Sequence, residues 1–228
     1  MLLRVLNLTI FTVAVVISGC SSASKNTSAS MSEVTKIQLP LSADAVRPVL
    51  VGTMSPDIKV RNPSGEEVDL SKVLAGRPSL LIFYRGGWCP YCNLQLSSLQ
   101  KIEKDIRKLG VQIIAVSPDR PEELIKSVAK HVLNYILISD SDMNAAKAFG
   151  IAYRVDDETV EKYKNYKIDL EASSGQNHHG LPVPSLFAIA RDGTIAFSYV
   201  NPNYKMRPSS DVVFAVARDI SKESTNSH

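Results

Sequence analysis

Apolar residues form several short runs along this chain, and turn-forming residues such as glycine and proline separate most of them. Residues 80–84 and 111–116 are almost wholly apolar, which is typical of strands buried on both faces of a sheet. Between these runs, apolar residues recur at steps of three and four within residues 99–109, the spacing of a helix with one buried face. The pattern therefore predicts a strand, a helix and a second strand.

The same alternation of apolar runs and turn signals continues towards the end of the chain. Strands alternating with helices, followed by a hairpin and a last helix, predict an α/β fold of three layers around a mixed central sheet. Residues 153–182 are polar, charged and irregular, and we expect them to form an insertion over the sheet. The other predicted elements are a short hairpin within 56–70, a helical turn at 71–76, helices at 122–131 and 211–220, a strand at 135–139, and a hairpin of 185–190 with 194–200.

The first 19 residues have the pattern of a secretory signal. Arg4 precedes a mostly apolar run at residues 5–17, which is shorter than the roughly 20 residues that a membrane-spanning helix needs. The run ends in Ile17-Ser18-Gly19-Cys20, which resembles the bacterial lipoprotein box. That resemblance implies cleavage before Cys20 and lipid on its new N-terminus. A plain signal peptide that leaves Cys20 in the mature chain is the alternative.

Residues 20–45 are interpreted as the lipidated cysteine and a flexible tether, because residues 21–33 are of low complexity and lack apolar periodicity. Several acyl chains, each contributing ~0.8 kcal/mol per buried CH₂, would hold the protein on a membrane. We therefore expect residues 46–222 to form a domain anchored in the bacterial cell envelope and facing the periplasm. The residue after the lipidated cysteine is Ser21 and not the aspartate that is associated with retention in the inner membrane. This slightly favours a location in the outer membrane. Disulfides persist in such an oxidising compartment.

Charge and composition exclude one class of partner. Of the 228 residues, 44% are apolar and 21% are charged, which is ordinary for a soluble globular protein. The formal net charge of +3 is small and evenly spread, and the sequence has no zinc-finger, basic-helix or RNP pattern. We therefore expect no nucleic acid partner.

Cys89 and Cys92 are the candidate reactive groups. They follow a buried strand and a Gly-Gly turn, at the point where helical spacing begins. Two thiols separated by two residues can close to a disulfide or open to a dithiol, so a redox-active Cys89–Cys92 disulfide is predicted. The N-terminus of a helix would lower the pKa of Cys89 from about 8.5 into the range of roughly 3.5–7.5, which makes Cys89 the expected nucleophile. Cys92 would resolve the mixed disulfide.

Other interpretations of the cysteine pair are weaker. A purely structural disulfide that closes so short a loop would add little stability through loop entropy. A zinc site of Cys89, Cys92, His178 and His179 would need four converging ligands, and adjacent histidines seldom supply two of them. No metal and no cofactor is therefore expected. The two histidines are interpreted as exposed loop residues that could border the active site.

The stretches FYRGGWCPYCNLQL and LPVPSLFAIARDGTI resemble the peroxiredoxin-like branch of the AhpC/TSA family, which has the thioredoxin fold. The resemblance covers residues 46–220 and implies an active site at the cysteine pair. In this fold a cis-proline faces the two cysteines, and Pro184 is the candidate, with Pro182 as the alternative. Val183 would then offer its backbone to a substrate peptide.

Four neighbours of the cysteines are further candidates for the active site. Pro90 suits the first helical turn because it has no N–H to leave unpaired. With Tyr91 it forms the Pro-Tyr dipeptide of glutaredoxins, which by analogy suggests an intermediate reduction potential. Trp88 either shields the cysteines or packs in the core. Arg85 either supplies positive charge beside the thiolates or is an ordinary surface arginine.

Peroxiredoxins carry a Pro-x-x-x-Thr-x-x-Cys pattern, from which this chain departs. Laid over the sequence, the pattern places its reactive cysteine on Cys92, its proline on Arg85 and its threonine on Cys89. The buried carboxylate that thioredoxin has on its central strand also lacks a counterpart at residues 80–84. A proton acceptor is therefore not identified.

These departures favour a thiol–disulfide oxidoreductase in which Cys89 attacks protein or small-molecule disulfides and an unidentified donor supplies electrons. The alternative is a thiol peroxidase that reduces peroxides through Cys92. A third hypothesis is a redox-inert scaffold lipoprotein that keeps the fold.

Overall fold

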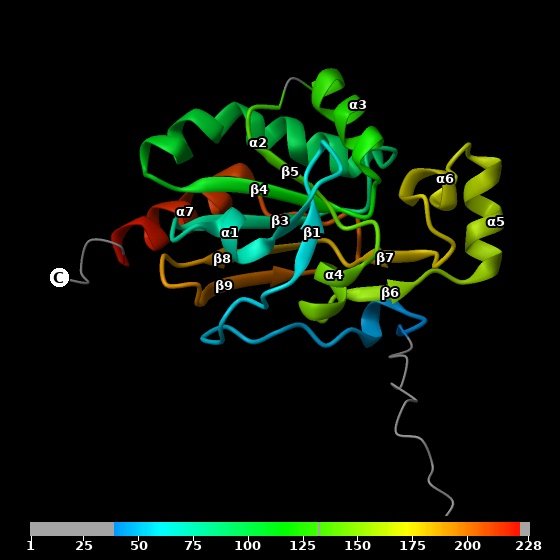
Figure 1. Cartoon of the computed structure of the whole chain (residues 1–228), viewed down its shortest axis with the longest axis horizontal. Helices are drawn as coiled ribbons and strands as arrows, with labels where there is room; N and C mark the ends of the chain where they lie inside the picture. The colour runs from blue at the N-terminus through cyan, green and yellow to red at the C-terminus, as the bar shows by residue number, and fades with distance from the viewer. Residues whose placement is uncertain (1–38, 132, 224–228) are drawn as a thin grey trace, which may run out of the picture. The chain divides into compact units, whose positions relative to one another are not determined.

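The predicted buried strands lie at the centre of a seven-stranded sheet in the computed structural model, which describes residues 39–131 and 133–223. The strand order is β2-β1-β5-β4-β3-β8-β9 (Figure 1), and parallel and antiparallel pairs both occur, so the sheet is mixed as predicted. The parallel strands are β3 (Ser79–Phe83), β4 (Gln112–Ser117) and β5 (Ile136–Ser139). The antiparallel strands are β1 (Lys59–Arg61), β2 (Glu67–Asp69), β8 (Ser185–Ile189) and β9 (Ile195–Val200).

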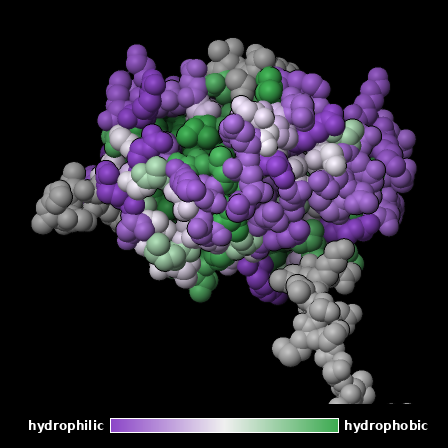
Figure 2. Space-filling view, in the orientation of Figure 1, coloured by the Kyte–Doolittle hydropathy of each residue, from purple (hydrophilic) through white to green (hydrophobic). Residues whose placement is uncertain are grey.

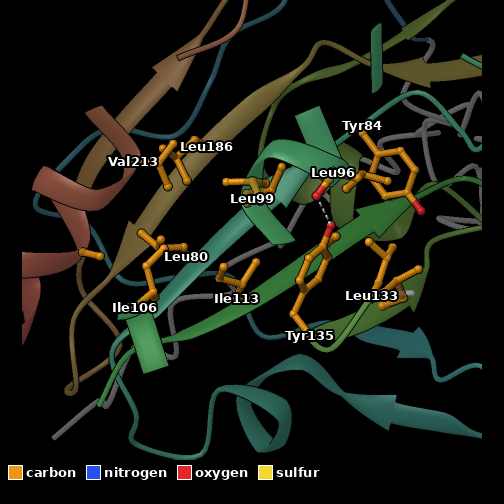
Figure 3. Packing of buried hydrophobic residues seen from close by; sticks show 14 of the residues in the cluster. Leu80, Tyr84, Leu96, Leu99, Ile106, Ile113, Leu133, Tyr135, Leu186 and Val213 are labelled. Atoms are coloured by element: carbon orange, nitrogen blue, oxygen red, sulfur yellow. Dashed lines mark hydrogen bonds between the residues drawn. The ribbon is translucent and has the colours of Figure 1, made fainter. Parts of the chain in front are cut away.

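Alternate residues of the central strands face opposite sides of the sheet, and each side has its own apolar core. In β3, Leu80 and Ile82 belong to one core, while Leu81 and Phe83 belong to the other. Figure 3 shows part of the first core, in which Tyr135 donates a hydrogen bond to the Leu96 carbonyl. The predicted three-layer α/β architecture is thus confirmed. The first core is covered by α2 (Pro90–Lys108), α3 (Pro121–His131) and α7 (Ser210–Glu223), and the second by α1 (Leu70–Leu74) and α4 (Asn144–Ala148).

The segment at 153–182 is regular, although its sequence predicts an irregular insertion. Asp156 and Asp169 cap its two helices by accepting backbone N–H bonds from Thr159 and Ala172. The outer surface of these helices is almost uniformly hydrophilic (Figure 2), which explains why their sequence is so polar. Their elements are β6 (Ala152–Arg154), α5 (Asp157–Asn165), α6 (Leu170–Ser174) and β7 (Gly180–Pro182), with β6 antiparallel to β7.

The inner side of this insertion has a small apolar core of its own, made by Val155, Val160, Leu170 and Leu181. Trp88 packs against this small core and also against the main core beneath α2. The insertion is therefore attached to the loop that carries the cysteines.

The prediction of a cis peptide bond at Pro184, or alternatively at Pro182, is wrong, because every described peptide bond is trans. The Val183 backbone is instead bonded within the protein: its N–H donates to the Ile151 carbonyl at 2.8 Å, and its carbonyl accepts from Ser185 Oγ at 2.7 Å. This connection between β7 and β8 is also buried. The Val183 backbone is therefore already used within the protein and is not free to bind a substrate peptide.

The predicted signal peptide, the lipidation site Cys20 and most of the predicted tether lie outside the described residues. The lipid anchor and the envelope address therefore stay predictions. The end of the tether differs from its prediction, because the Pro40 carbonyl accepts a hydrogen bond from the Arg154 N–H and Leu39 packs on the second core. Within the part of the chain that the structure describes, no helix is both long and apolar enough to cross a membrane.

Candidate active site

Cys89 occupies the N-cap position of α2, and Pro90 is the first residue of that helix. Cys92 lies one turn further on, and the Asn93 N–H donates to the Cys89 carbonyl at 3.0 Å, which holds the first turn in place. Both cysteines are free thiols here, and their exposed fractions are only 1% and 0%. The structure therefore has the dithiol form, and the Cys89–Cys92 disulfide stays a prediction.

The two thiols differ in how easily they lose a proton. A hydrogen bond from the Cys92 thiol lowers the pKa of Cys89 to about 6, assisted by the charges of Arg85 and Arg207 and opposed by burial. Burial raises the pKa of Cys92 well above that of an ordinary thiol, and the hydrogen bond to Cys89 raises it further. At neutral pH Cys89 is thus a thiolate and Cys92 a thiol. This difference favours Cys89 as the nucleophile.

Arg85 is buried, with an exposed fraction of 2%, so its interpretation as a surface arginine is wrong. The carbon of its guanidinium group lies 5.0 Å from the ring centroid of Trp88, 5.5 Å from that of Tyr163 and 4.2 Å from that of Tyr204. Its Nη2 donates a hydrogen bond to the Tyr163 hydroxyl. The aromatic faces stabilise the cation in place of a carboxylate. Its charge remains available to act on the Cys89 thiolate.

Trp88 and Tyr91 extend this aromatic group on either side of Cys89. The Trp88 ring lies 5.9 Å from the Tyr163 ring of α5, and it packs on the cores of both the main domain and the insertion. The Tyr91 ring lies 5.7 Å from the Tyr204 ring, edge to face. Trp88 therefore packs in the core, and its role in shielding the cysteines stays a prediction.

His178 and His179 are engaged within the insertion and its surroundings. The His178 ring donates to the Ser141 carbonyl and accepts from the Gly180 N–H, at 2.8 and 2.7 Å. The His179 ring lies 2.7 Å from Glu171 Oε1. Both line a small pocket together with Arg85 and Trp88, so they border the active site and are only partly exposed. In residues 39–131 and 133–223, no three His, Cys, Asp or Glu side chains are grouped to hold a metal ion.

Arg207 belongs to the site but is not predicted by the sequence. It precedes α7, and its Nη2 lies 3.7 Å from Cys92 Sγ. Its Nε donates to Gln95 Oε1 at 2.9 Å, and its Nη1 donates to the carbonyls of Tyr204 and Met206. These contacts hold the guanidinium beside the cysteines. Since Arg207 follows Cys92 by more than a hundred residues, no local pattern connects the two.

Asp119 is a second residue that the sequence does not identify. Its carboxylate is 1% exposed and accepts hydrogen bonds from the Gly87 N–H at 2.8 Å and from Ser117 Oγ at 3.1 Å. Burial raises its pKa to about 6, with a smaller contribution from Cys89. In the sequence, Ser-Pro-Asp-Arg-Pro is interpreted only as the opening of a helix. Parallel β3 and β4 end at the same edge of the sheet, however, and this places Asp119 beside the cysteine loop.

The Gly-Gly turn is required by this close packing. A Cβ atom on Gly86 would lie 2.4 Å from Trp88 Nε1 and 2.8 Å from Asp119 Oδ1, and Gly86 has a φ of +144°. A Cβ atom on Gly87 would lie 2.3 Å from Ser127 Oγ. A side chain at either position would displace Asp119, Trp88 or Ser127 from the site.

Comparison with known proteins identifies the family. Residues 51–198 match the AhpC/TSA family, which is well over half of the chain. The chain belongs to the AhpC/TSA family. The chain is 30% identical over 106 residues to peroxiredoxin Bcp of Escherichia coli K12, which is 46% of this chain and 67% of that protein. It is 31% identical over 101 residues to peroxiredoxin Bcp of Bacillus subtilis 168, which is 44% of this chain and 64% of that protein.

Solved structures agree with this AhpC/TSA assignment at the level of the fold. Peroxidoxin BcpB of Mycobacterium tuberculosis superposes with a TM-score of 0.57 at 18% identity, over 76% of this chain and 96% of that one. A peroxiredoxin-like protein of Aquifex aeolicus gives 0.58 at 18% identity, over 76% and 89%. With the family match and the Bcp relatives, this AhpC/TSA protein is a peroxiredoxin-like antioxidant oxidoreductase.

The effect of Arg207 on the thiolate can be measured. Replacement Arg207→Gln should raise the pKa of Cys89, by at most about one unit, because it removes a positive charge that stabilises the thiolate. The pKa is read from the pH dependence of thiolate absorbance or of alkylation by iodoacetamide. Arg107→Gln is the control, because Arg107 lies at the far end of α2 and is paired with Glu103. An equal pKa in the two variants would contradict the role of Arg207.

The buried carboxylate of Asp119 should reduce stability at neutral pH. A folded-state pKa raised from 3.8 to about 6 means that ionisation destabilises the folded protein as the pH rises through this interval. The stability of Asp119→Asn relative to the parent should therefore increase by about 2.4 kcal/mol between about pH 4 and about pH 7.5. Denaturant unfolding at both pH values measures this difference, and no change between them would show that Asp119 is not perturbed.

Proposed function

We propose that this protein is a thiol peroxidase that reduces small hydroperoxides at Cys89, with Cys92 as the resolving cysteine. The observation that carries the proposal is a buried thiolate: Cys89 has a pKa of about 6 and an exposed fraction of 1%. A hydroperoxide is small enough to reach such a sulfur. A protein disulfide must align its own sulfur atoms with the attacking thiolate, and the enclosure of Cys89 opposes that approach.

The Val183 backbone supports the same choice of substrate. Its N–H and carbonyl are hydrogen-bonded to Ile151 and Ser185, so the edge that would bind a substrate peptide is occupied. The names of the Bcp relatives, peroxiredoxins, also favour peroxide as the substrate. The pattern Pro-x-x-x-Thr is absent, but the Arg85 and Arg207 guanidinium groups supply positive charge to this site. That charge stabilises negative charge developing on the leaving oxygen.

The reaction proceeds in three steps. The Cys89 thiolate attacks one oxygen of the hydroperoxide, an S–O bond forms, the O–O bond breaks, and the leaving alkoxide takes up a proton to become an alcohol. The Cys92 sulfur then attacks the Cys89 sulfenic acid, so that an S–S bond forms, the S–O bond breaks and water leaves. An external dithiol finally reduces the disulfide, supplying two electrons and two protons.

A second candidate function is the exchange of small disulfides. It is favoured by the position of Cys89 at the N-cap of α2 with Cys92 one turn away, an arrangement that suits attack on any accessible disulfide. It is the function that the sequence alone favours. It differs from the first candidate in the oxidant and not in the roles of the two cysteines.

Single-cysteine variants separate these candidates. In a chain with Cys20→Ser, so that only the pair remains of the three cysteines, Cys89→Ser should reduce peroxide consumption to background. Cys92→Ser should still consume one equivalent of peroxide rapidly but fail to form the disulfide. Peroxide consumption and sulfenic acid trapping by dimedone measure both outcomes. Consumption that survives in Cys89→Ser and is lost in Cys92→Ser would instead assign peroxide attack to Cys92. Reduction of a small disulfide without peroxide consumption would favour the second candidate.

A further inference from the structure

A groove of about 270 Å³ lies beside the cysteines, where the loop before α7 meets the first turns of α2. Three exposed apolar side chains line it: Tyr91, Leu94 and Met206 have exposed fractions of 40%, 68% and 52%. Large apolar side chains that are exposed together are typical of a binding surface. We call this surface the Leu94 groove, after the most exposed of the three.

The Leu94 groove is positively charged. Lys205 and Arg207 are the charged residues of its lining, which contains no aspartate or glutamate. The hydrogen-bond partners of the Arg207 guanidinium are all uncharged, namely the Gln95 amide, two backbone carbonyls and the Cys92 thiol. Lys205 is exposed. The groove therefore combines apolar surface with positive charge that its own lining does not neutralise, and this combination is complementary to an anion with an apolar body.

Arg207 joins the groove to the cysteines, because it lines the groove and its Nη2 lies 3.7 Å from Cys92 Sγ. The groove is thus on the Cys92 side of the pair. When a thiolate attacks a disulfide, the sulfur with the lower pKa is the better leaving group. The pKa of Cys89 is lowered and that of Cys92 is raised. An attack on Cys92 that expels Cys89 is therefore the favoured direction, and the groove lies on that side.

We propose that the Leu94 groove binds the external dithiol that reduces the disulfide, and that this donor is a small dithiol with an apolar chain and an anionic group. The inference rests on the proposed function, whose last step requires a dithiol. The anion would contact Lys205 at the exposed end of the groove, the chain would cover the apolar side chains, and the thiols would reach Arg207. The volume of the groove is close to the roughly 300 Å³ at which small-molecule sites begin, which favours a small donor over a protein.

The transfer of electrons takes place in two exchanges. One donor thiol loses its proton to solvent, and its sulfur attacks Cys92 Sγ after the Arg207 side chain has turned aside. A bond between the donor and Cys92 forms, the Cys89–Cys92 bond breaks, and Cys89 leaves as a thiolate. The second donor sulfur then attacks the first and closes the disulfide of the donor, and its proton passes to the released Cys92. Two electrons move from the donor to the protein, and one proton remains in solvent.

Dihydrolipoate and dihydrolipoamide are matched probes, because they share a dithiol and an apolar chain and differ in a carboxylate or an amide. Protein with Cys20→Ser is oxidised to the disulfide by diamide, an azo compound that takes up two electrons and two protons, and is separated from the excess. Each donor is then mixed with it at low ionic strength, and reduction is followed by the fluorescence of Trp88, the one tryptophan of the chain. Dihydrolipoate should reduce the parent about fivefold faster than dihydrolipoamide, a factor expected of one exposed ion pair.

Variants at the exposed positions of the groove assign this ratio of rates. Lys205→Gln should bring the ratio close to one, and Lys205→Arg, which keeps the charge, should preserve it. Leu94→Ser should slow both donors by the same factor, because it removes an apolar contact that they share. Lys108→Gln is the matched control: Lys108 is an exposed lysine at the other end of α2, paired with Asp105 at 2.8 Å, and its loss should leave the ratio unchanged.

Equal rates for the two donors in the parent would overturn the inference, as would a ratio that survives in Lys205→Gln or rates that are unaffected by Leu94→Ser. Because diamide forms the disulfide, these measurements do not depend on peroxide. A reduced protein that fails to consume hydrogen peroxide would overturn the proposed peroxidase function instead, and the ratio of the two donors would still decide whether the groove binds the dithiol.

Discussion

The hydrogen bond that Cys92 donates to Cys89 determines which sulfur of this protein reacts. It is the largest influence that lowers the pKa of Cys89, and the same bond helps to keep the proton on Cys92. Both sulfurs are buried, so neither is screened by water and the interaction between them is strong. The hydrogen bond between the two sulfurs thus makes the pKa of Cys89 lower than that of Cys92. The position of Cys89 at the N-terminus of α2 and the charges of Arg85 and Arg207 lower the pKa of Cys89 further. One thiolate and one thiol are the arrangement that a nucleophile and a resolving group require.

Burial of this pair makes demands on the surrounding structure. A cation that balances the thiolate must itself be buried, and Arg85 is enclosed by the rings of Trp88, Tyr163 and Tyr204. Tyr163 comes from the insertion, so the insertion completes the electrostatic environment of the site as well as covering it. The glycines before Trp88 leave room for Asp119 to approach the loop.

Much of the fold could be predicted from the sequence, because the apolar runs at residues 80–84 and 111–116 have the periodicity of strands that are buried on both faces. The cysteine pair was recognisable for a similar reason, since its chemistry is local. The engagement of the Val183 backbone was not predictable, because its N–H bonds to Ile151, which is distant in the sequence. A charged residue such as Arg85 is ordinarily exposed, and only the tertiary structure brings three aromatic rings around it.

The two residues that the sequence did not identify illustrate the same limit. Asp119 reaches the site through the parallel pairing of β3 and β4, and Arg207 through the loop that precedes α7. Neither belongs to a local motif. The insertion was interpreted as irregular because its outward positions are polar, although Asp156 and Asp169 are ordinary helix caps.

Substrate selectivity tests the central claim that an enclosed Cys89 thiolate is reserved for small oxidants. The measurement is the ratio of two second-order rate constants for oxidation of the reduced protein, one for hydrogen peroxide and one for a protein disulfide such as oxidised insulin. Both are followed by Trp88 fluorescence at the same pH. Faster reaction with peroxide by orders of magnitude is the predicted result. A larger rate constant for the protein disulfide would contradict the account.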